Sequence, residues 1–565
     1  MLNYSQIISS LISLDGVDVN SIKSLISETK DLVNGDYSLP CFSFAKQLRQ
    51  SPMAIAQNIA NSFQDKFHPF DKIEAVNGYV NFYVNREKFC ENYFNDCEET
   101  ELISNKKYAG KTLCVEYSSV NLAKYMHVGH LSTTVIGESL ARINSALGYN
   151  VVRMNYVGDW GTPFGKMISA YKLWGNKEDV NQRGVDAIQD LYIRFAKESE
   201  KNPELEQIAR DTFKALEQGD KEVNEIYKWF IEITIDETKR LTDLMGASFN
   251  TWRGESYYKD KMQNVVEMLE NKKLLQESQG AQIVNLEDYK LGVCMVQKSD
   301  GTSIYATRDI AAAIDRYNTY KFDKMIYVTA VQQKLHFQQF FKVLQLCGFE
   351  WAKNLHHCYY GMISLPEGKI ASRKGKQALL KDILNEAISS AKKVIENRND
   401  EMLDIEETAL KVGIGAVAYC PLKNEKIKDT VFDLQSAISF DGETAPYMQY
   451  SYARANNILG KIELKSLCGV KPNYQSVSDN NTFALIKALA NFEKTVNQAA
   501  DNMEPSIISK YLIDICKMFN KFYHDNRVAG TEPAVMSARV NLCMQFAKVL
   551  KFGLKLICIE CPTKM

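Results

Sequence analysis

Two histidines that flank a glycine, His127 and His130 around Gly129, are the residues of this sequence best suited to phosphate chemistry. A short apolar run, Thr112 to Tyr117, precedes them, and apolar residues recur at helical spacing from Leu131 to Leu147. The pattern predicts a buried strand, a loop and a helix that starts at the histidines. Free N–H groups at a helix start bind phosphate, glycine lets a nucleotide approach the backbone, and imidazoles donate hydrogen bonds to a charged phosphoryl group. By itself the spacing also arises by chance, so the surrounding elements must decide.

Those elements fit one half of a doubly wound α/β fold. A second apolar segment, Val151 to Tyr156, follows the helix and completes a strand–helix–strand unit. A second half resumes near residue 299, with a strand and a helix start at 323–337 and a strand that leads into the Gly- and Lys-rich segment 359–376. Residues 170–290, between the halves, are charged and amphipathic, which predicts a mostly helical insertion. Ligands of such sheets bind at the carboxyl ends of the strands.

The length of 565 residues predicts about three domains or more. We expect a small α/β domain at 1–108, the nucleotide-binding domain at 109–408 and a helical bundle at 409–565. The first domain shows three helical patterns and one strand-like run, at Tyr4–Leu14, Ile22–Leu32, Met53–Phe63 and 75–85.

Net charge, cysteines and hydropathy exclude several classes of protein. The formal net charge is −1, so any RNA contact must rely on local patches. The 13 cysteines lie mostly inside apolar runs, as expected of reduced thiols in the cytoplasm. Cys558 and Cys561 form a CxxC pair with no second pair or histidine nearby, so no metal site is predicted. No apolar run is long enough to span a membrane and the start does not resemble a signal peptide, so we expect a cytoplasmic protein.

The tetrapeptide HVGH at 127–130 resembles the HIGH signature of class I aminoacyl-tRNA synthetases. The wider strings SSVNLAKYMHVGHLSTTVIG and GDWGTPFG are similar to one family of that class, the arginyl-tRNA synthetases, and the resemblance runs through nearly the whole chain. It implies a Rossmann-like catalytic domain with a helical insertion, an N-terminal domain that contacts the tRNA elbow, and a helical anticodon-binding domain. It further implies a monomeric ligase that joins L-arginine to tRNA-Arg with ATP and Mg²⁺, and that activates arginine only with tRNA bound.

Six positions match those that hold arginine in the family. The family patterns E-[YF]-S-S-x-N and Y-x-T-R-D stand here at 116–121 and 305–309. Carboxylates and amides suit a guanidinium fork, although from residue type alone each could be a surface group, and Asp309 could be a helix N-cap. The resemblance assigns arginine binding to Glu116, Ser119, Asn121, Tyr305, Asp309 and Gln333.

The segment GKIASRKGK answers to the KMSKS signature, whose mobile cation meets the leaving pyrophosphate. Lys369 to Arg373 occupy its five positions, and the fourth-position lysine is absent; in the family, Lys124 is thought to compensate. Without HVGH upstream, a solvated basic loop would be the simpler interpretation. The resemblance assigns catalysis to His127, His130, Lys124 and Lys369, and ATP binding to His127, Gly129, His130, Met362, Lys369, Ser372 and Arg373.

Four departures from the family bear on loop geometry. Val120 and Tyr125 replace prolines, Pro163 replaces a glutamine, and Lys334 stands where an acidic residue is common.

Aromatic and amide side chains mark candidate RNA contacts. Single-stranded bases stack on aromatics, and Tyr447 and Tyr450 lie three apart on one face of a predicted helix. Tyrosines at helical spacing also pack into bundle cores, and a terminal methionine is ordinarily frayed. The resemblance assigns tRNA binding to Tyr79, Asn81, Tyr447, Tyr450, Tyr523 and Met565, with Arg527 beside the anticodon loop.

Two other functions remain open at this point. A different HxGH nucleotidylyltransferase, which transfers AMP or CMP to a small acceptor, would leave the helical C-terminus and the tyrosine pair unexplained. A non-catalytic tRNA-binding relative would not need the intact set Glu116, Asn121, His127, His130, Tyr305, Asp309 and Lys369.

Overall fold

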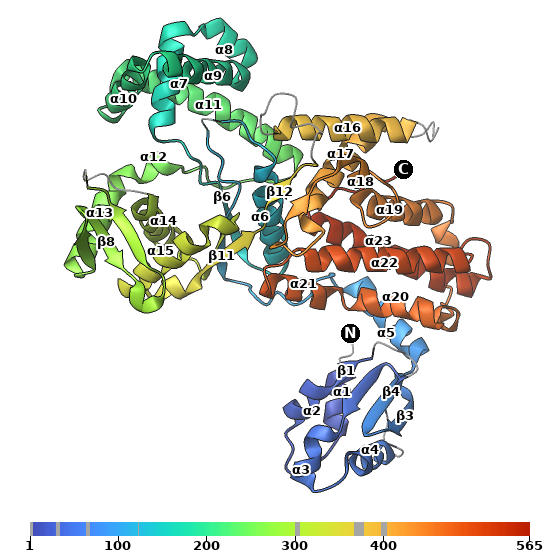
Figure 1. Ribbon diagram of the computed structural model, residues 1–565. Helices are drawn as coiled ribbons and strands as arrows, with labels where there is room; N and C mark the ends of the chain where they lie inside the picture. The colour runs from blue at the N-terminus through green and yellow to red at the C-terminus, as the bar shows by residue number, and fades with distance from the viewer. Residues whose placement is uncertain are drawn as a thin grey trace. The chain divides into compact units, whose positions relative to one another are not determined.

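The computed structural model describes residues 4–29, 34–63, 68–122, 124–299, 305–366, 378–396 and 404–565. The chain divides into two compact units, and Figure 1 gives the order of their elements. Unit 1 comprises Met1–Ser104, Ala455–Glu493 and Asp514–Val549, and unit 2 comprises Asn105–Arg454, Lys494–Ile513 and Leu550–Met565. The C-terminal helices therefore contribute to both units.

A parallel four-stranded sheet forms the centre of unit 2 (Figure 1). Its order is β11-β10-β5-β6, and each neighbouring pair is parallel. The chain moves outward in opposite directions from β5 and β10, so the carboxyl ends of these two strands form the switch point where ligands of this fold bind. This confirms the predicted doubly wound α/β fold. The strands are β5 (Thr112–Glu116), β6 (Asn150–Met154), β10 (Lys324–Ala330) and β11 (Leu355–Tyr360).

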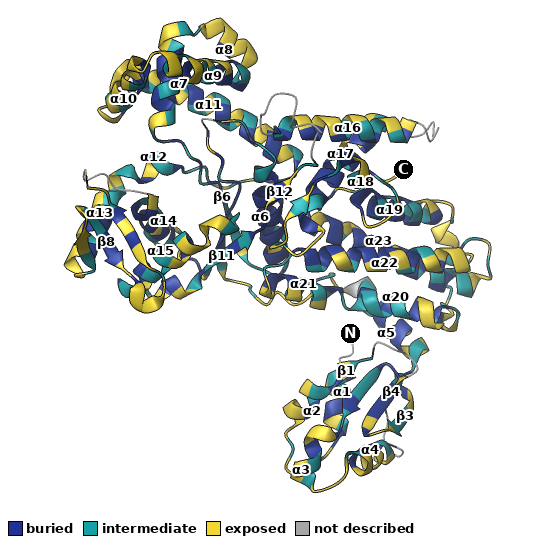
Figure 2. Cartoon of the chain, in the orientation of Figure 1, coloured by how far each residue is buried: buried dark blue, intermediate teal, exposed yellow. Residues whose placement is uncertain are grey.

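Helix α6 (Gly129–Ala146) joins β5 to β6 and is buried along most of its length, as Figure 2 shows. The helix lies close to the residue that follows β5, because a Cβ at Gly137 would stand 2.2 Å from Tyr117 Cβ. Gly148, with φ of +101°, follows the end of the helix, where a left-handed residue is typical. The expected strand, loop and helix are thus confirmed to within one or two residues.

The predicted insertion is helical in its first part, but it also contributes strands. The antiparallel sheet β7-β8-β9 contains a hairpin whose turn residues, Gln279 and Gly280, both have positive φ. The elements are α7 (Thr162–Trp174), α8 (Lys177–Arg183), α9 (Val185–Lys201), α10 (Glu204–Glu217), α11 (Lys221–Leu244), α12 (Glu255–Tyr258), α13 (Met262–Asn271), β7 (Leu275–Ser278), β8 (Ala281–Asn285) and β9 (Val293–Gln297). Helices α14 (Tyr305–Tyr320) and α15 (Lys334–Leu346) then flank β10, with η5 (Val331–Gln333) between β10 and α15.

Unit 1 contains an antiparallel sheet of order β1-β2-β4-β3. The single strand expected at 75–85 is wrong: β3 ends at Val76, and Asn77 and Gly78, with φ of +49° and +83°, turn the chain into β4. An Asn-Gly pair is a strong hairpin signal that should have divided the run. The elements before residue 100 are α1 (Tyr4–Leu11), α2 (Val19–Leu25), β1 (Ser27–Glu28), β2 (Tyr37–Pro40), α3 (Ala45–Leu48), α4 (Pro52–Asn61), β3 (Phe70–Val76), β4 (Tyr79–Val84) and α5 (Arg86–Glu99).

The chain after residue 404 is mostly helical, although β13 (Thr430–Val431) is a short strand, and this confirms the helical C-terminal part. These helices are α17 (Ile405–Tyr419), α18 (Leu434–Ala437), α19 (Ala445–Gly460), α20 (Asn480–Ala490), α21 (Phe492–Asp501), α22 (Ser506–Asp525) and α23 (Pro533–Leu556), preceded by α16 (Leu380–Glu396). Over the described ranges, no helix combines the length and apolarity that a bilayer crossing requires.

Candidate active site

The two histidines of HVGH lie at the start of α6 with their rings 4.1 Å apart. The N–H of Gly129 donates to Nδ1 of His127 at 3.1 Å, and the N–H of His127 donates to Nδ1 of His130 at 3.1 Å. Because each Nδ1 accepts a hydrogen bond, each neutral ring carries its proton on Nε2. The loop therefore holds two imidazoles as Nε2–H donors.

Burial keeps the two imidazoles neutral, and a glycine at position 129 leaves room for the ring of His127. Burial lowers the pKa of His130 to about 3, with a further contribution from His127, and burial together with Lys124 lowers the pKa of His127. A Cβ at Gly129 would stand 2.8 Å from Cε1 of His127, so a side chain here would displace that ring. Glycine at this position thus serves the histidine directly.

The chain that follows the KMSKS-like segment pairs with the HVGH loop. His127 and Leu379 form an antiparallel bridge, the N–H of Val128 donates to Ala378 O at 3.1 Å, and the N–H of Leu380 donates to Met126 O at 2.9 Å. Lys369, Ser372 and Arg373, predicted to bind ATP, lie outside the described residues. Met362 is exposed, and its N–H donates to Oδ1 of Asp429 at 2.7 Å.

Tyr125, one of the departures from the family, ties the same loop to two other elements. Its hydroxyl donates to Oδ1 of Asp186 on α9 at 2.5 Å, and Lys381 on α16 donates to the same oxygen at 2.6 Å. The Lys381 ammonium also lies 4.9 Å from the Tyr125 ring. Tyr125 therefore adds a contact between the loop and the insertion that a proline could not make. Lys124, next to it, is exposed.

The other departures are accommodated locally. Val120 is buried, and Pro163 lies in the first turn of α7, where a missing N–H costs little. The Lys334 ammonium lies 4.9 Å from the ring of Tyr359.

Ser118 and Ser119, just after β5, adopt the left-handed conformation with φ of +70° and +48°. Such strain costs about 1–3 kcal/mol per residue and persists only where neighbours hold it. Here the N–H of Ser118 donates to Thr133 Oγ1 and that of Ser119 to Asn155 Oδ1, each at 3.1 Å. Ser119 Oγ and Asn155 Nδ2 are buried and have no hydrogen-bond partner among the described residues, so both can serve a ligand.

Glu116, at the end of β5, is paired with Arg316 of α14. Glu116 Oε2 lies 2.5 Å from Arg316 Nη1, and the two side chains are 5% and 4% exposed. Burial alone would lower the pKa of Arg316, but the Glu116 carboxylate keeps it well above the usual value, so the guanidinium stays charged. Glu116 therefore already has a permanent cationic partner.

Asp309, Tyr305 and His336 meet where α14 and α15 begin. His336 Nε2 donates to Asp309 Oδ2 at 2.6 Å, and the Tyr305 ring lies edge-on to the His336 ring at 4.9 Å. Asp309 lies inside α14 rather than at its start, so the alternative that it caps this helix is wrong. Gln333 is exposed at the end of η5, and Asn121 is exposed and bridges to Gly158. The structure thus places the predicted arginine-binding residues at or just after the end of β5, after β10 and in the first turns of α14.

The predicted tRNA-binding residues of unit 2 lie near the last residues of the chain. Tyr447 and Tyr450 are half-buried on α19, and Arg454 lies 4.8 Å from the Tyr450 ring. Phe440 lies 6.4 Å from the same ring and packs, with Met565, against an apolar cluster of α16 and α17. The terminal methionine is therefore packed rather than frayed.

In unit 1, Tyr79 and Asn81 of β4 differ in accessibility. Tyr79 is 42% exposed and lies 5.2 Å from the Phe42 ring, whereas Asn81 is buried and accepts from Ser38 Oγ at 2.8 Å. Tyr523 on α22 is also 42% exposed. Arg527, nearby in sequence, donates from Nε to Ala529 O at 3.0 Å.

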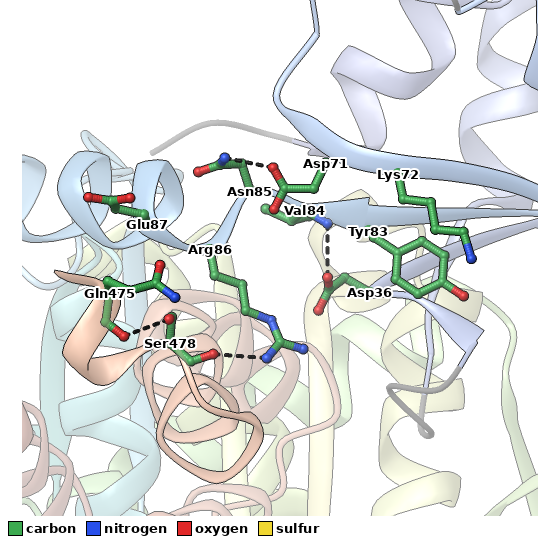
Figure 3. Close-up of a pocket in the computed structure, with 10 residues that line it drawn as sticks. All are labelled: Asp36, Asp71, Lys72, Tyr83, Val84, Asn85, Arg86, Glu87, Gln475 and Ser478. Carbon is green, nitrogen blue, oxygen red and sulfur yellow. Dashed lines mark hydrogen bonds between the residues drawn. The ribbon is translucent and has the colours of Figure 1, made fainter.

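A cavity of about 420 Å³ lies in unit 1 beside β3, β4 and the start of α5 (Figure 3). Arg86 donates from Nη1 to Ser478 O at 2.9 Å and to Asn480 Oδ1 at 2.8 Å. Asp36 accepts from the N–H of Val84 at 2.9 Å. None of the predicted tRNA-binding residues is among those that line it, and the charged groups named are engaged within unit 1.

Several residues around the site were missed at the sequence level. Arg316 and Asn155 contact the predicted residues Glu116 and Ser119, but they lie far from them along the chain and carry no local signal. His336 lies in the segment predicted to begin a helix after Gln333, but the sequence does not show that it contacts Asp309.

Comparisons with known proteins agree with this architecture. A family model described as "tRNA synthetases class I (R), catalytic domain" matches residues 97–434. Models of the DALR anticodon binding domain and of the arginyl tRNA synthetase N terminal domain match 448–565 and 4–84.

Individual relatives are similar over the full length. The arginine–tRNA ligase of Halothermothrix orenii is 42% identical, with 100% of each chain covered, and that of Clostridium perfringens is 43% identical, with 97% of each covered. The solved arginyl-tRNA synthetase of Thermus thermophilus has a TM-score of 0.79 and 25% identity, with 96% of each chain covered. That of Plasmodium falciparum, at 22% identity, shares the fold with a TM-score of 0.78 over 100% of this chain and 97% of its own. The chain therefore belongs to the arginyl-tRNA synthetase family of class I tRNA synthetases.

Proposed function

We infer that this chain is an arginine–tRNA ligase, which activates L-arginine with ATP and transfers the arginyl group to the 3′ end of tRNA. The observation that carries the inference is the 42% identity to an arginine–tRNA ligase over the whole of both chains. A nucleotidylyltransferase of another kind is disfavoured because the matches extend through the N-terminal and anticodon-binding domains.

In activation, a carboxylate oxygen of arginine attacks the α-phosphorus of ATP, and the bond to the bridging oxygen breaks as pyrophosphate leaves. Negative charge moves onto the phosphoryl oxygens in the transition state. The Nε2–H donors of His127 and His130, fixed in advance by their Nδ1 hydrogen bonds, are suited to stabilise that charge. Neutral imidazoles can do so without a change of protonation.

The β- and γ-phosphates require cations, and we propose Lys124 and Lys369 for them, with Met362, Ser372 and Arg373 at the ATP site. The backbone pairing of Leu379 with His127 supports this, because Leu379 follows the KMSKS-like segment by only a few residues in sequence. We propose that Mg²⁺ arrives on the phosphates of ATP, as this ion usually does. Over the described part of the chain, no group of three His, Cys, Asp or Glu side chains is placed to hold a metal, so we assign the ion no protein ligand.

For arginine itself we propose Asp309 as the carboxylate that binds the guanidinium, with Tyr305 and Gln333 beside it. For the amino and carboxylate groups of arginine we propose the turn after β5, with Ser119 and Asn121. Ser119 Oγ is suited to this role because it has no hydrogen-bond partner among the described residues. We propose that Glu116 acts mainly through Arg316, whose charge it neutralises.

For tRNA we propose Tyr447, Tyr450 and Met565 around the anticodon together with Tyr523, and Tyr79 and Asn81 at the elbow. Tyr79 and Tyr523 are exposed enough to stack on bases. We further propose that activation requires bound tRNA-Arg, that the protein acts as a monomer and that it works in the cytoplasm. The last is supported by 13 free cysteines.

Pyrophosphate exchange measured with each of the common amino acids, with and without tRNA, tests the function. Among the amino acids, we expect only arginine to support exchange, and we expect this exchange to require tRNA. Exchange that ignores the amino acid would indicate a nucleotidylyltransferase, and no exchange under any condition would indicate a non-catalytic relative. Robust exchange without tRNA would overturn only the proposed tRNA requirement.

A further inference from the structure

Three carboxylates lie where β5, α12 and α14 approach one another, and their partners differ. Glu116 is paired with Arg316 at 2.5 Å, and Glu255 is paired with Arg308 at 2.8 Å. Asp309 has a histidine, His336, at 2.6 Å. Arginine is a permanent cation, whereas a histidine is often neutral and then only donates a hydrogen bond. Of these three carboxylates, Asp309 is the one that is not paired with an arginine of the chain.

One oxygen of Asp309 is already fixed. Oδ2 accepts from His336 Nε2, and among the described residues no hydrogen bond reaches Oδ1. The terminal torsion of an aspartate is broad, so an unsupported carboxylate can present its plane in many directions. A donor from a second helix selects one direction, and a guanidinium fork demands a defined carboxylate plane.

The His336 ring is itself held from several sides. The rings of Tyr305, Phe340 and Phe337 lie 4.9, 5.4 and 5.5 Å from it, and its side chain is 17% exposed. A donor with so little freedom can transmit its orientation to Asp309. A substrate group that meets Asp309 Oδ1 would therefore find a carboxylate fixed by α15 as well as by α14.

We propose that His336 is a positioning residue for arginine selection, which donates Nε2–H to Asp309 and thereby orients that carboxylate toward the substrate guanidinium. The inference rests on the proposed function, because it assumes that arginine is the amino acid activated. It adds a residue on α15 to the selection of the guanidinium.

The test compares three variants of the full chain with tRNA present. His336→Leu keeps an apolar filling but removes the donor, and we expect the KM for arginine to rise about 10- to 100-fold, as for loss of a hydrogen bond to a charged group. His336→Gln places an amide N–H near the position of Nε2, so we expect the KM to return to within about fivefold of the parent. His336→Asn is too short to reach Asp309, and we expect it to behave like His336→Leu.

A comparison of two ligands, arginine and citrulline, distinguishes a positioning role of His336 from a purely structural one. Citrulline, in which an uncharged urea replaces the guanidinium, competes with arginine for the same site. We expect the ratio of the citrulline inhibition constant to the arginine KM to fall about 10- to 100-fold in His336→Leu, while the KM for ATP stays within about twofold. A packing defect would weaken both ligands together and leave the ratio unchanged.

His357→Gln is the matched control. This histidine stacks on Phe337 at 4.2 Å, as a neighbour of His336, but its Nε2 lies 2.7 Å from Thr329 Oγ1 rather than near Asp309. We expect its arginine-to-citrulline ratio to equal that of the parent. The proposal is overturned if His336→Asn matches His336→Gln, or if the ratio is unchanged in His336→Leu. If His336→Leu does not fold, the Gln and Asn variants decide by the same ratio. A parent protein that fails to activate arginine at all would instead overturn the proposed function.

Discussion

The end of β5 and the first turns of α14 each carry a carboxylate predicted to meet arginine, and the two have different surroundings. Glu116 and Arg316 form a buried pair, with side chains 5% and 4% exposed. Asp309 and His336 form an accessible pair, with side chains 23% and 17% exposed. A buried carboxylate paired with an arginine of the chain holds the fold together, whereas an accessible carboxylate with one hydrogen-bonded oxygen can still bind a charged ligand.

The HVGH loop adds a third kind of environment. His130 is half-buried beside His127, and this partial burial lowers its pKa and keeps the ring neutral. Unit 2 therefore contains three different environments for a titratable group: a buried pair with an arginine, an accessible pair with a histidine, and a half-buried neutral histidine. Which outcome occurs depends on the partner supplied by a distant part of the chain.

The largest effect should come from the buried pair. Glu116→Gln leaves the Arg316 guanidinium buried without its counter-charge, so we expect the free energy of unfolding to fall by about 3–5 kcal/mol. Denaturant unfolding at neutral pH measures it.

Glu255→Gln is the matched control, because its partner Arg308 is also an arginine but the Glu255 side chain is 26% exposed. We expect a loss of only about 1 kcal/mol there. If both variants lose the same stability, or if Glu116→Gln is stable but no longer binds arginine, then Glu116 serves the ligand and the comparison is wrong.

The accessible pair should respond in binding instead. Asp309→Asn keeps an acceptor for His336 but removes the charge, so we expect arginine to bind about 2–5 kcal/mol more weakly. The ratio kcat/KM for arginine should fall correspondingly, by about 30- to 5000-fold. The melting temperature and the affinity for ATP should hardly change, and steady-state kinetics with thermal unfolding of the same samples checks all three. A lower melting temperature with an unchanged KM for arginine would make Asp309 a structural residue.

Local patterns carried most of what could be predicted. The strand, the HVGH loop and α6 are adjacent in sequence, so apolar periodicity and one glycine were enough to find them. The partner of Glu116 could not be found this way, because Arg316 lies on a helix that follows the whole insertion. Nothing in the sequence around Arg316 distinguishes it from a surface arginine.

Two hairpins show the other limit, a signal that was present but not used. Asn77 and Gly78 are the turn residues of a two-residue hairpin, yet the alternation of Tyr79, Asn81 and Tyr83 after them favoured one long strand. The hairpin at Gln279 and Gly280 was hidden for a different reason, because the amphipathic insertion before it favours a helical reading of the whole stretch. Turn residues were decisive in both cases, and side-chain periodicity was not.

The neutral histidine should be visible in the pH dependence of stability. The pKa of His130 is lowered from 6.5 to about 3 in the folded chain, so on acidification the unfolded chain takes up this proton first. Above about pH 6.5, His130 is neutral in both the folded and the unfolded chain and costs no stability. As the pH falls from 6.5 toward 3, the free energy of unfolding decreases, because only the unfolded chain binds the proton. We expect this residue to cost about 2 kcal/mol at about pH 5. The drop in unfolding free energy from about pH 7 to 5 should therefore be smaller by that amount in His130→Gln, and an equal drop in both proteins would contradict the buried neutral state.

The smallest effect concerns Tyr305, whose ring packs against His336 and whose hydroxyl is predicted to meet arginine. Tyr305→Phe keeps the ring contact at 4.9 Å and removes only the hydroxyl, so the orientation of Asp309 should persist. Loss of one neutral hydrogen bond costs about 0.5–1.5 kcal/mol, and we expect the KM for arginine to rise about 2- to 10-fold with no change in melting temperature. Tyr317→Phe, which alters a tyrosine of the same helix stacked on Trp351, should leave that KM unchanged. If Tyr305→Phe also leaves it unchanged, Tyr305 contributes only its ring, and the accessible pair meets the guanidinium without its hydroxyl.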